Sequence, residues 1–335
     1  MGWRNPNVPW RELERRLSAG APGRARVAPE TSWPPGDGGD STAWSRRRGP
    51  YDPTPLVRGR SRVPDAELHC HSNFSFLDGA SHPEELVEEA VRLGLEGLAL
   101  TDHDGFYGVV RFAEAARVHG LATVFGVELT LGATQPANGV ADPEGAHLMV
   151  LARDPVGYAR LGAVVSRAQM AGEKSAPRAA LADLAAEATG PARGHWVALT
   201  GCRKGTVPAA LSRRGPGAAA TELARLVEVF GREHVVVELW DHGDPLDSAR
   251  NDALAALAVR AGVEVVATNN VHYATPRQRP LAAALAAVRA RRSLDEMDGW
   301  LPAAAGAHLR SGEEQARRFA RYPGVVERSA ELARA

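Results

Sequence analysis

The pattern of hydrophobic and polar positions along the chain changes near residue 65. From there on, short apolar runs recur and are separated by amphipathic stretches rich in alanine and leucine. We expect strands at residues 66–71, 97–101, 122–127, 146–151, 195–199, 235–239 and 263–268. Because strands alternate with helices for most of this length, the pattern predicts a largely parallel sheet flanked by helices.

The first helix of this region has a signal at each end. Ser81 and Glu84 have the spacing of a capping box. The helix that follows, over 84–93, ends at Gly94. The segment 132–145, which contains glycine, proline and asparagine, is expected to be a loop or a hairpin. Further helices are expected over 109–118 and after Pro155.

The two ends of the chain lack this alternation. Residues 1–64 are rich in proline, glycine and arginine and bury too little apolar surface to offset the entropy of ordering. We interpret them as a mostly disordered leader with one short helix near 9–17. The basic run 46–48 is either a contact for a phosphate backbone or a solvated linker cluster. After residue 275 helical segments follow at 281–290, 313–320 and 325–335.

These patterns predict three regions, namely a leader over 1–64, an α/β domain over 65–275 and a helical extension over 276–335. The chain stops inside a helical pattern without a glycine or asparagine cap, as expected for part of a longer protein.

Composition narrows the class of protein. The chain has 335 residues with 40 basic and 40 acidic side chains, so any attraction to phosphate must be local. An apolar fraction of 44% supports a sizeable core. Two cysteines make a disulfide framework improbable and fit a reducing compartment. The absence of a secretory signal and of a long apolar stretch predicts a cytoplasmic protein with no membrane contact.

The candidate chemistry lies at the ends of the predicted strands. Four stretches, at 67–71, 101–104, 126–128 and 270–272, each place imidazole or carboxylate groups there. Convergent strand ends are how a barrel builds a site from residues that are distant in sequence. This placement favours a closed or nearly closed barrel with a polynuclear metal site at one mouth.

The first stretch carries a chelating pair. His69 and His71 are two residues apart on a strand, so both side chains face the same way and Cys70 faces the other. Two imidazoles on one face suit Zn²⁺, Mn²⁺ or Fe²⁺. Asp78 follows in a turn that can fold back over the strand end. The alternative is that one imidazole bonds Asp78 while the other faces solvent.

Later strands supply further ligand candidates. His103 follows an apolar strand directly, and Asp102 beside it is expected to orient an imidazole from outside the ligand set. Asp104 is expected instead to cap the following turn. Glu128 is a candidate bridging carboxylate, unless it is an ordinary exposed strand-end residue. His147, which begins its strand, is a further ligand candidate.

Two more groups complete the set. Cys202 follows the strand at 195–199 and is either a ligand or a small buried apolar residue. Arg203 and Lys204 next to it are candidates for holding a phosphate group. His272 is the last ligand candidate along the chain.

So many donors exceed the needs of one ion, so two to three divalent ions are implied. Clustered ions suit phosphoester hydrolysis, since one ion activates water while the others hold phosphate oxygens. Asp102 or His147 would then move protons.

The motifs together resemble the PHP (polymerase and histidinol phosphatase) superfamily. Segments 71–79, 100–108 and 267–273 resemble the PHP domain that opens bacterial C-family polymerases, which are similar to the polymerase III α-subunit. The leader 2–15 and the segment 289–294 resemble the error-prone, damage-tolerant branch. The resemblance implies a distorted (β/α)₇ barrel with up to three bound ions.

The resemblance also implies a ligand set, and one position departs from it. The implied ligands are His69, His71, Asp78, His103, Glu128, His147, Cys202, residue 270 and His272. Residue 270 is normally aspartate in the family, whereas this chain has Asn270, whose amide offers a carbonyl oxygen but no charge. We expect weaker binding of at least one ion.

Three readings of the function follow. The first is the PHP region of an error-prone polymerase, with DNA, Mg²⁺ and clamp or translesion accessory proteins as partners of the parent enzyme. No carboxylate triad for nucleotidyl transfer is found after Tyr273, so this segment alone is not expected to polymerise DNA. The second is a stand-alone phosphoesterase, and the third is a catalytically silent scaffold.

Overall fold

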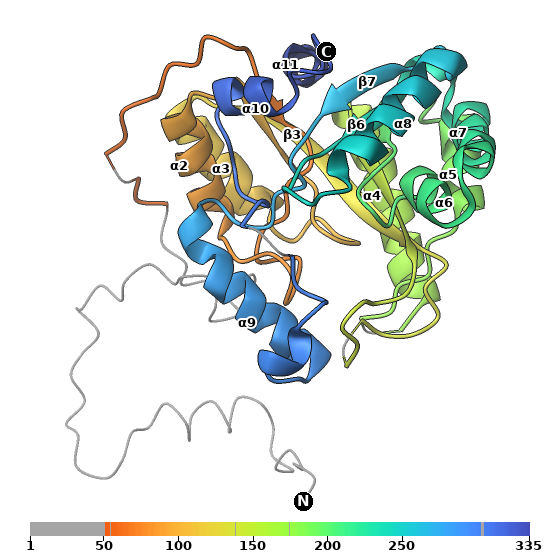
Figure 1. The fold of residues 1–335 in the computed structure, drawn as a ribbon, viewed down its shortest axis with the longest axis horizontal. Helices are drawn as coiled ribbons and strands as arrows, with labels where there is room; N and C mark the ends of the chain where they lie inside the picture. The colour runs from red at the N-terminus through yellow and green to blue at the C-terminus, as the bar shows by residue number, and fades with distance from the viewer. Residues whose placement is uncertain (1–50, 54, 138, 174, 303–304) are drawn as a thin grey trace, which may run out of the picture. The chain divides into compact units, whose positions relative to one another are not determined.

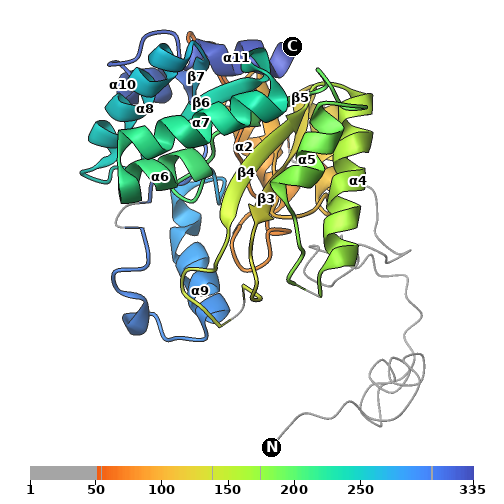
Figure 2. The ribbon, with the colours of Figure 1, turned by 90° about the vertical axis from the view of Figure 1, so that its right-hand side faces the viewer.

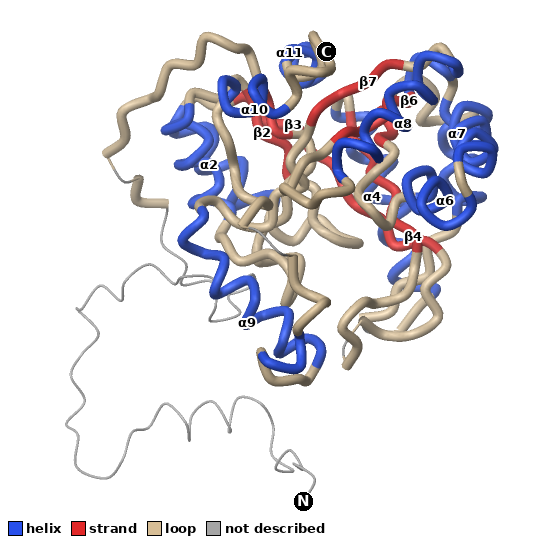
Figure 3. The backbone as a smooth tube through the Cα atoms, viewed as in Figure 1, coloured by secondary structure: helices blue, strands red, loops and turns tan. Residues whose placement is uncertain are grey.

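The computed structural model describes residues 51–335, apart from 54, 138, 174 and 303–304 (Figure 1). One sheet contains all the named strands, and strands are drawn in red in Figure 3. The spatial order of the strands follows the chain from β1 to β7. The strands are β1 (Ala66–Glu67), β2 (Gly97–Leu100), β3 (Ala122–Leu131), β4 (Ala146–Ala152), β5 (Trp196–Leu199), β6 (Val235–Leu239) and β7 (Glu264–Ala267).

The sheet curls until its first and last strands meet. Just beyond β1 and β7, a bridge joins Cys70 and Val271. The amide of His71 donates to the carbonyl of Val271 at 2.8 Å, and the amide of Val271 donates to the carbonyl of His69 at 2.7 Å. The predicted α/β fold with a curled, barrel-like sheet is confirmed.

Strand β4 is the exception to the predicted parallel sheet. It pairs antiparallel with β3 and with β5, whereas the other neighbouring pairs are parallel. The reason lies in the segment 132–145, which returns the chain as a hairpin without the crossover helix that a parallel connection needs. The N-terminal end of β4 therefore lies beside the C-terminal ends of the other strands.

Most of the helices cover the outer side of the curled sheet, and α9 (Arg279–Ala290) and α11 (Glu327–Arg334) lie at its ends (Figure 2). The other helices are α2 (Pro83–Leu93), α3 (Val109–His119), α4 (Pro155–Ala171), α5 (Leu181–Ala188), α6 (Thr206–Arg214), α7 (Pro216–Phe230), α8 (Asp247–Ala261) and α10 (Gly312–Arg318). Short 3₁₀ turns lie at Arg232–His234, Pro276–Gln278 and Asp295–Met297. None of the helices in the described part of the chain has the length and apolar character to cross a membrane.

Helix α2 shows that the predicted capping box is wrong by one residue. The N-cap is His82, and its amide donates to the carboxylate of Glu85 at 2.8 Å. Ser81 is unavailable for this role because its hydroxyl accepts the amide of Ala274, also at 2.8 Å. The predicted stop is correct, since Gly94 takes the left-handed conformation with φ of 76°.

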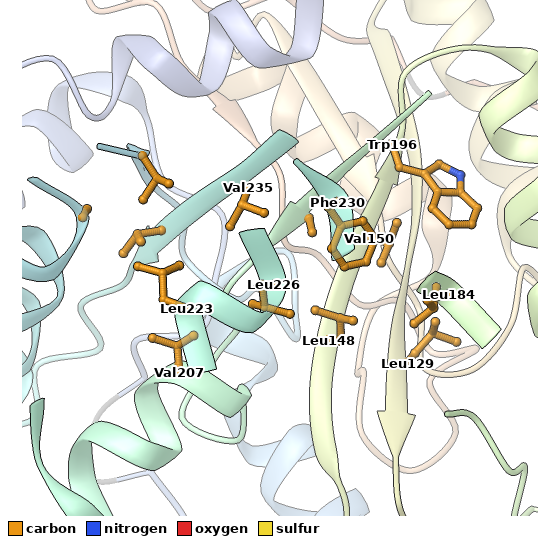
Figure 4. Close-up of a cluster of buried hydrophobic side chains, with 14 of the residues drawn as sticks. Leu129, Leu148, Val150, Leu184, Trp196, Val207, Leu223, Leu226, Phe230 and Val235 are labelled. Carbon is orange, nitrogen blue, oxygen red and sulfur yellow. The ribbon is translucent and has the colours of Figure 1, made fainter. Parts of the chain in front are cut away.

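Two layers of apolar packing hold the barrel. The larger one lies between strands and outer helices, where Leu148, Trp196 and Phe230 pack together (Figure 4). The second layer lies on the inner face of the sheet. It consists of Ala66, Leu68, Ala99, Val124, Met149, Leu151, Val197, Leu199, Val236 and Val266. Side chains alternate between these two layers along each strand, as the pleat requires.

The two ends of the barrel are covered differently. Leu332 and Ala333 of α11 pack against the inner apolar layer. Helix α9 lies at the opposite end of the molecule from α11 in both views (Figures 1 and 2). One end of the barrel is thus closed by apolar contacts, and the other is left for polar groups.

Residues 51–64, assigned to the leader on sequence grounds, form neither helix nor strand where they are described. They nevertheless bond to the helical layer. The amide of Gly59 donates to Val91 at 2.9 Å, and Tyr51 donates to Glu88 at 2.6 Å. The predicted helix near 9–17 and the basic run 46–48 lie outside the described residues.

Candidate metal centre

In β3 and β4 the site residues lie on the same face of the sheet as the apolar side chains that fill the barrel interior. In β3, Val124 lines the interior and Glu128 lies four residues further toward the mouth. In β4, Met149 lines the interior and His147 precedes it by two residues. His147 is therefore at the N-terminal end of its strand, as its position in the predicted strand indicated. It reaches the same mouth because β4 is antiparallel.

Strand β1 is shorter than predicted and ends where the site begins. The carboxylate of Glu67 accepts the amide of His69 at 2.8 Å, which interrupts the regular pleat. His69 and His71 then converge, with 3.1 Å between their Nε2 atoms. Cys70 between them packs in the outer apolar layer against the helices. Two imidazole nitrogens this close need a proton or a cation between their lone pairs.

Glu128 lies at the centre of the site and is almost fully buried. Four imidazoles surround its carboxylate. The separations from it are 3.5 Å for His69 Nε2, 3.3 Å for His71 Nε2, 3.3 Å for His103 Nδ1 and 3.1 Å for His147 Nδ1. Two groups of three donors, each compact enough for one ion, share this residue. They are His69, His71 and Glu128, and His103, Glu128 and His147.

Cys202 extends the second group. Its sulfur lies 3.5 Å from Nδ1 of His147 and 3.7 Å from Glu128. The tight turn that carries it needs Gly201, which has φ of 79°. Burial raises the pKa of the Cys202 thiol well above its usual range, so a thiolate here requires a cation beside it.

Asp78 connects His103 to one further imidazole, His272, at the mouth. Its Oδ2 lies 3.2 Å from Nε2 of His103 and 3.0 Å from Nδ1 of His272. The preceding residue, Leu77, holds a left-handed φ of 59°, which folds the loop back over the strand end. The ring of His272 also lies 4.9 Å from that of His71, centroid to centroid.

Asn270 also stands at this mouth with an unusual backbone. Its φ is 41°, a conformation that asparagine and aspartate tolerate better than other side chains. Its Oδ1 is buried and has no hydrogen-bond partner within the described part of the chain. A buried, unpaired carbonyl oxygen costs free energy, so a bound cation fits this position.

Asp102 is placed to position other groups. Its Oδ1 accepts hydrogen bonds from the Ser72 amide at 2.7 Å and the Ser75 hydroxyl at 2.8 Å. The same hydroxyl lies 3.2 Å from Nδ1 of His71. Among the described residues Asp102 thus reaches an imidazole through Ser75, and its part in proton transfer stays a prediction.

The predicted phosphate-binding pair has another partner. Arg203 donates to Asp142 at 2.7 Å, and Lys204 lies 3.2 Å from the same carboxylate. Asp142 belongs to the hairpin loop, whose position relative to this strand end could not be read from the sequence. Both cations are therefore paired with this one carboxylate of the loop.

Two residues at the site were missed. Glu238 accepts the Nδ1–H of His69 at 2.7 Å, and its strand offered a signal, a carboxylate within an otherwise apolar run. Such a partner fixes the tautomer and leaves Nε2 free toward the cavity. Arg289 of α9 donates to Asp78, a contact that nothing in the local sequence indicates.

The electrostatics of the site favour a cation. Burial alone lowers the pKa of His69, but the carboxylates of Glu238 and Glu128 raise it to about 10. Burial and the neighbouring His103 lower the pKa of His71 to about 3. Burial opposes ionisation of Glu128, yet His147 and His69 hold its pKa well below the usual range. An anionic carboxylate thus lies between a protonated and a neutral imidazole, and a metal ion would displace the proton.

Comparison with known families matches residues 67–242 to the PHP domain. The chain belongs to the PHP domain family. Its His and Glu cluster at the barrel mouth is compatible with divalent metal binding. One similar solved structure is a two-domain protein from Bacteroides vulgatus with a predicted PHP-like metal-dependent phosphoesterase. Its sequence is 18% identical to that of this chain. It covers 66% of this chain and 57% of its own, with a TM-score of 0.42.

Two curated relatives are much more similar in sequence. The error-prone DNA polymerase of Nocardia farcinica is 51% identical over 377 residues, covering 100% of this chain and 32% of the relative. The error-prone DNA polymerase of Mycobacterium bovis is 54% identical over 333 residues, covering 99% and 29% respectively. The chain therefore spans about a third of the length of the relatives it matches.

Proposed function

We propose that this chain is the N-terminal PHP region of an error-prone DNA polymerase and that its barrel mouth is a metal-dependent phosphoesterase site acting on DNA ends. The observation that carries the second part is the shared carboxylate of Glu128, around which two compact donor groups meet. The first part rests on the two polymerase relatives, which match the chain over essentially its whole length. A cytoplasmic location, Mg²⁺ in the parent enzyme and clamp or translesion accessory partners follow from this assignment.

Each ion would have a defined set of ligands. His69, His71 and Glu128 would hold one ion, and His103, Glu128, His147 and Cys202 the other. Asp78, Asn270 and His272 extend the same mouth. When bound, such ions supply a water activated as a nucleophile and positive charge for phosphate oxygens. Zn²⁺, Mn²⁺ and Fe²⁺ all suit a set that mixes imidazole, carboxylate and thiolate.

The surrounding side chains orient this set. Glu238 holds Nδ1 of His69, and Ser75 holds Nδ1 of His71, so Nε2 of each ring faces the other ring. His147 lies at the edge of the cluster with 13% of its side chain exposed, which suits exchange of a proton with solvent. Asp102 accepts hydrogen bonds from the hydroxyls of Ser72 and Ser75, and Ser75 in turn contacts and so positions the ring of His71.

His103→Ala tests the metal site directly. His103 contacts both Glu128 and Asp78, so we expect the variant to bind at least one ion fewer per chain and to lose 3′–5′ degradation of a primer in Mn²⁺. Metal content is measured on the purified 335-residue chain by mass spectrometry of the elements. His195→Ala is the matched control, because His195 pairs with Asp154 at 2.6 Å just before β5, at the other end of that strand.

The outcomes of this test separate the three readings. If the unaltered chain binds metal and degrades the primer, the proposal is supported. Metal bound with hydrolysis of a small phosphate monoester but not of DNA favours the stand-alone phosphoesterase. Unchanged metal content in His103→Ala, or no metal in the unaltered chain, would reject the ligand set and leave the scaffold reading.

Phe76 provides a separate test of DNA as the substrate. The side chain is 76% exposed and lies on the loop that carries Asp78, two residues away. Exposed aromatic rings bind single strands by stacking on bases, at about 1–3 kcal/mol per base. Phe76→Ala should raise KM for a single-stranded 3′ end by roughly tenfold. Hydrolysis of a small chromogenic phosphodiester should not change.

Val259→Ala is the control for this prediction. Val259 is 80% exposed on α8, in a helix that contributes no residue to the metal centre. An equal loss on both substrates in Phe76→Ala would mean that the residue only supports the loop, and an unchanged KM would exclude stacking.

A further inference from the structure

We propose that the guanidinium of Arg289 takes the place of a third cation beside Asp78, which limits the site to two divalent ions. The inference rests on the proposed metal site and concerns how many ions it accepts. The described residues provide two complete donor groups around Glu128. Of the remaining ligand candidates, Asp78 and His272 contact each other, and Asp78 also contacts Arg289 of α9.

Asp78 already has partners on both of its oxygens. Oδ2 contacts His103 and His272 at 3.2 and 3.0 Å. Oδ1 accepts a hydrogen bond from Nη1 of Arg289, which also lies 3.4 Å from the carbonyl of Leu77. The carboxylate charge that would attract an ion to this side is therefore paired with a fixed positive charge.

Arg289 is held in this position by its own backbone and by burial. Its carbonyl accepts the amide of Gly139 in the hairpin loop at 2.7 Å. Only 16% of the Arg289 side chain is exposed, and only 19% of the Asp78 side chain is exposed. Arginine stays protonated in proteins, so the charge cannot be removed to admit an ion.

Asn270 brings no negative charge to the mouth. Its amide oxygen is buried and unpaired among the described residues, but it carries no net charge. A divalent ion placed here would meet the guanidinium of Arg289 with only the carboxylate of Asp78 to balance both. Like charges close together repel strongly in a buried site. Glu128 is farther from this repulsion, because it contacts Nδ1 of His103 whereas Asp78 contacts Nε2 on the opposite side of that ring.

The test counts ions per chain in four proteins. They are the unaltered 335-residue chain, Asn270→Asp, the double variant Asn270→Asp with Arg289→Met, and Arg292→Met as a matched control. Arg292 is exposed, and its charge lies over Trp300 rather than at the site. Each protein is saturated with Mn²⁺ under buffered conditions, freed of excess metal and analysed for elements and by native mass spectrometry. Circular dichroism melting shows that each variant is folded.

We expect two ions in the unaltered chain, in Arg292→Met and in Asn270→Asp, and three in the double variant. Three ions in the unaltered chain, or in Asn270→Asp alone, would overturn the inference, because Arg289 would then not be limiting. Two ions in the folded double variant would overturn it as well. If His103→Ala still loses metal in that case, the proposed metal site stands and only the part assigned to Arg289 fails. No metal in the unaltered chain would overturn both.

Discussion

Glu128→Gln should empty the metal site. The substitution keeps the shape of the side chain but removes the only carboxylate that both donor groups share among the described residues. Its amide nitrogen would also face imidazole nitrogens that now point at an anion. Changes to groups that only orient ligands cost about 10–100-fold in metal affinity, so we expect the loss of this shared ligand to cost more than about 100-fold and hydrolysis to fall with it. Elemental analysis and a chelator competition titration measure the loss.

Glu89→Gln controls for the removal of a buried glutamate. Glu89 lies on α2, bonded to Arg92 at 2.6 Å, and contributes nothing to the barrel mouth. This variant should keep its full metal content. If Glu128→Gln also kept both ions, then Glu128 would not bridge them, and the geometry around the four imidazoles would need a different explanation.

Much of the metal centre could be predicted from the sequence, because at each strand end an apolar run is directly followed by a residue that can bind metal. His69, His71, His103 and Glu128 follow or end apolar runs, so the rule that parallel strand ends converge was enough to place them together. The predicted turn at Asp78 required only that the chain fold back locally, and the positive φ of Leu77 achieves this. Local pattern and general topology together were sufficient for these residues.

The remaining features depend on contacts between distant segments. The strand of His147 runs antiparallel, which depends on the length of the preceding hairpin and not on the strand itself. The contact of Arg289 with Asp78 joins residues 211 positions apart. The pairing of Arg203 with Asp142 likewise joins two loops. Side-chain spacing within one element carries no information about such contacts, so a structure was needed to find them.

Asp65 should make the stability of the fold depend on pH. It lies just before β1 and is only 5% exposed. Burial raises its pKa to about 7, although hydrogen bonds from Ser329 and from the Ala66 backbone oppose this rise. Ser329 belongs to α11, which closes the apolar end of the barrel. The titration of Asp65 is therefore coupled to the packing of that helix.

The direction of the effect follows from proton linkage. In the unfolded chain Asp65 has the ordinary aspartate pKa of 3.8, so between about pH 4 and pH 7 the folded state binds the proton and the unfolded state has released it. The contribution of Asp65 is fully present below pH 4 and is lost as the pH rises through about 7. The loss should approach about 1.4 kcal/mol for each pH unit within this window.

Asp65→Asn removes this proton and keeps the side-chain shape. The difference in unfolding free energy between the unaltered chain and Asp65→Asn should therefore decrease steadily from about pH 4.5 to about pH 6.5, in urea titrations of both proteins. Burial raises the pKa of Glu67 to about 8, so Glu67 also makes stability depend on pH. Because Glu67 is present in both proteins and titrates in the same sense in each, the difference between them reports on Asp65. Asp183→Asn, an exposed change on α5, should show no such trend. A constant difference for Asp65→Asn across the window would mean that Asp65 is ionised in the folded protein, with α11 docked over a buried charge.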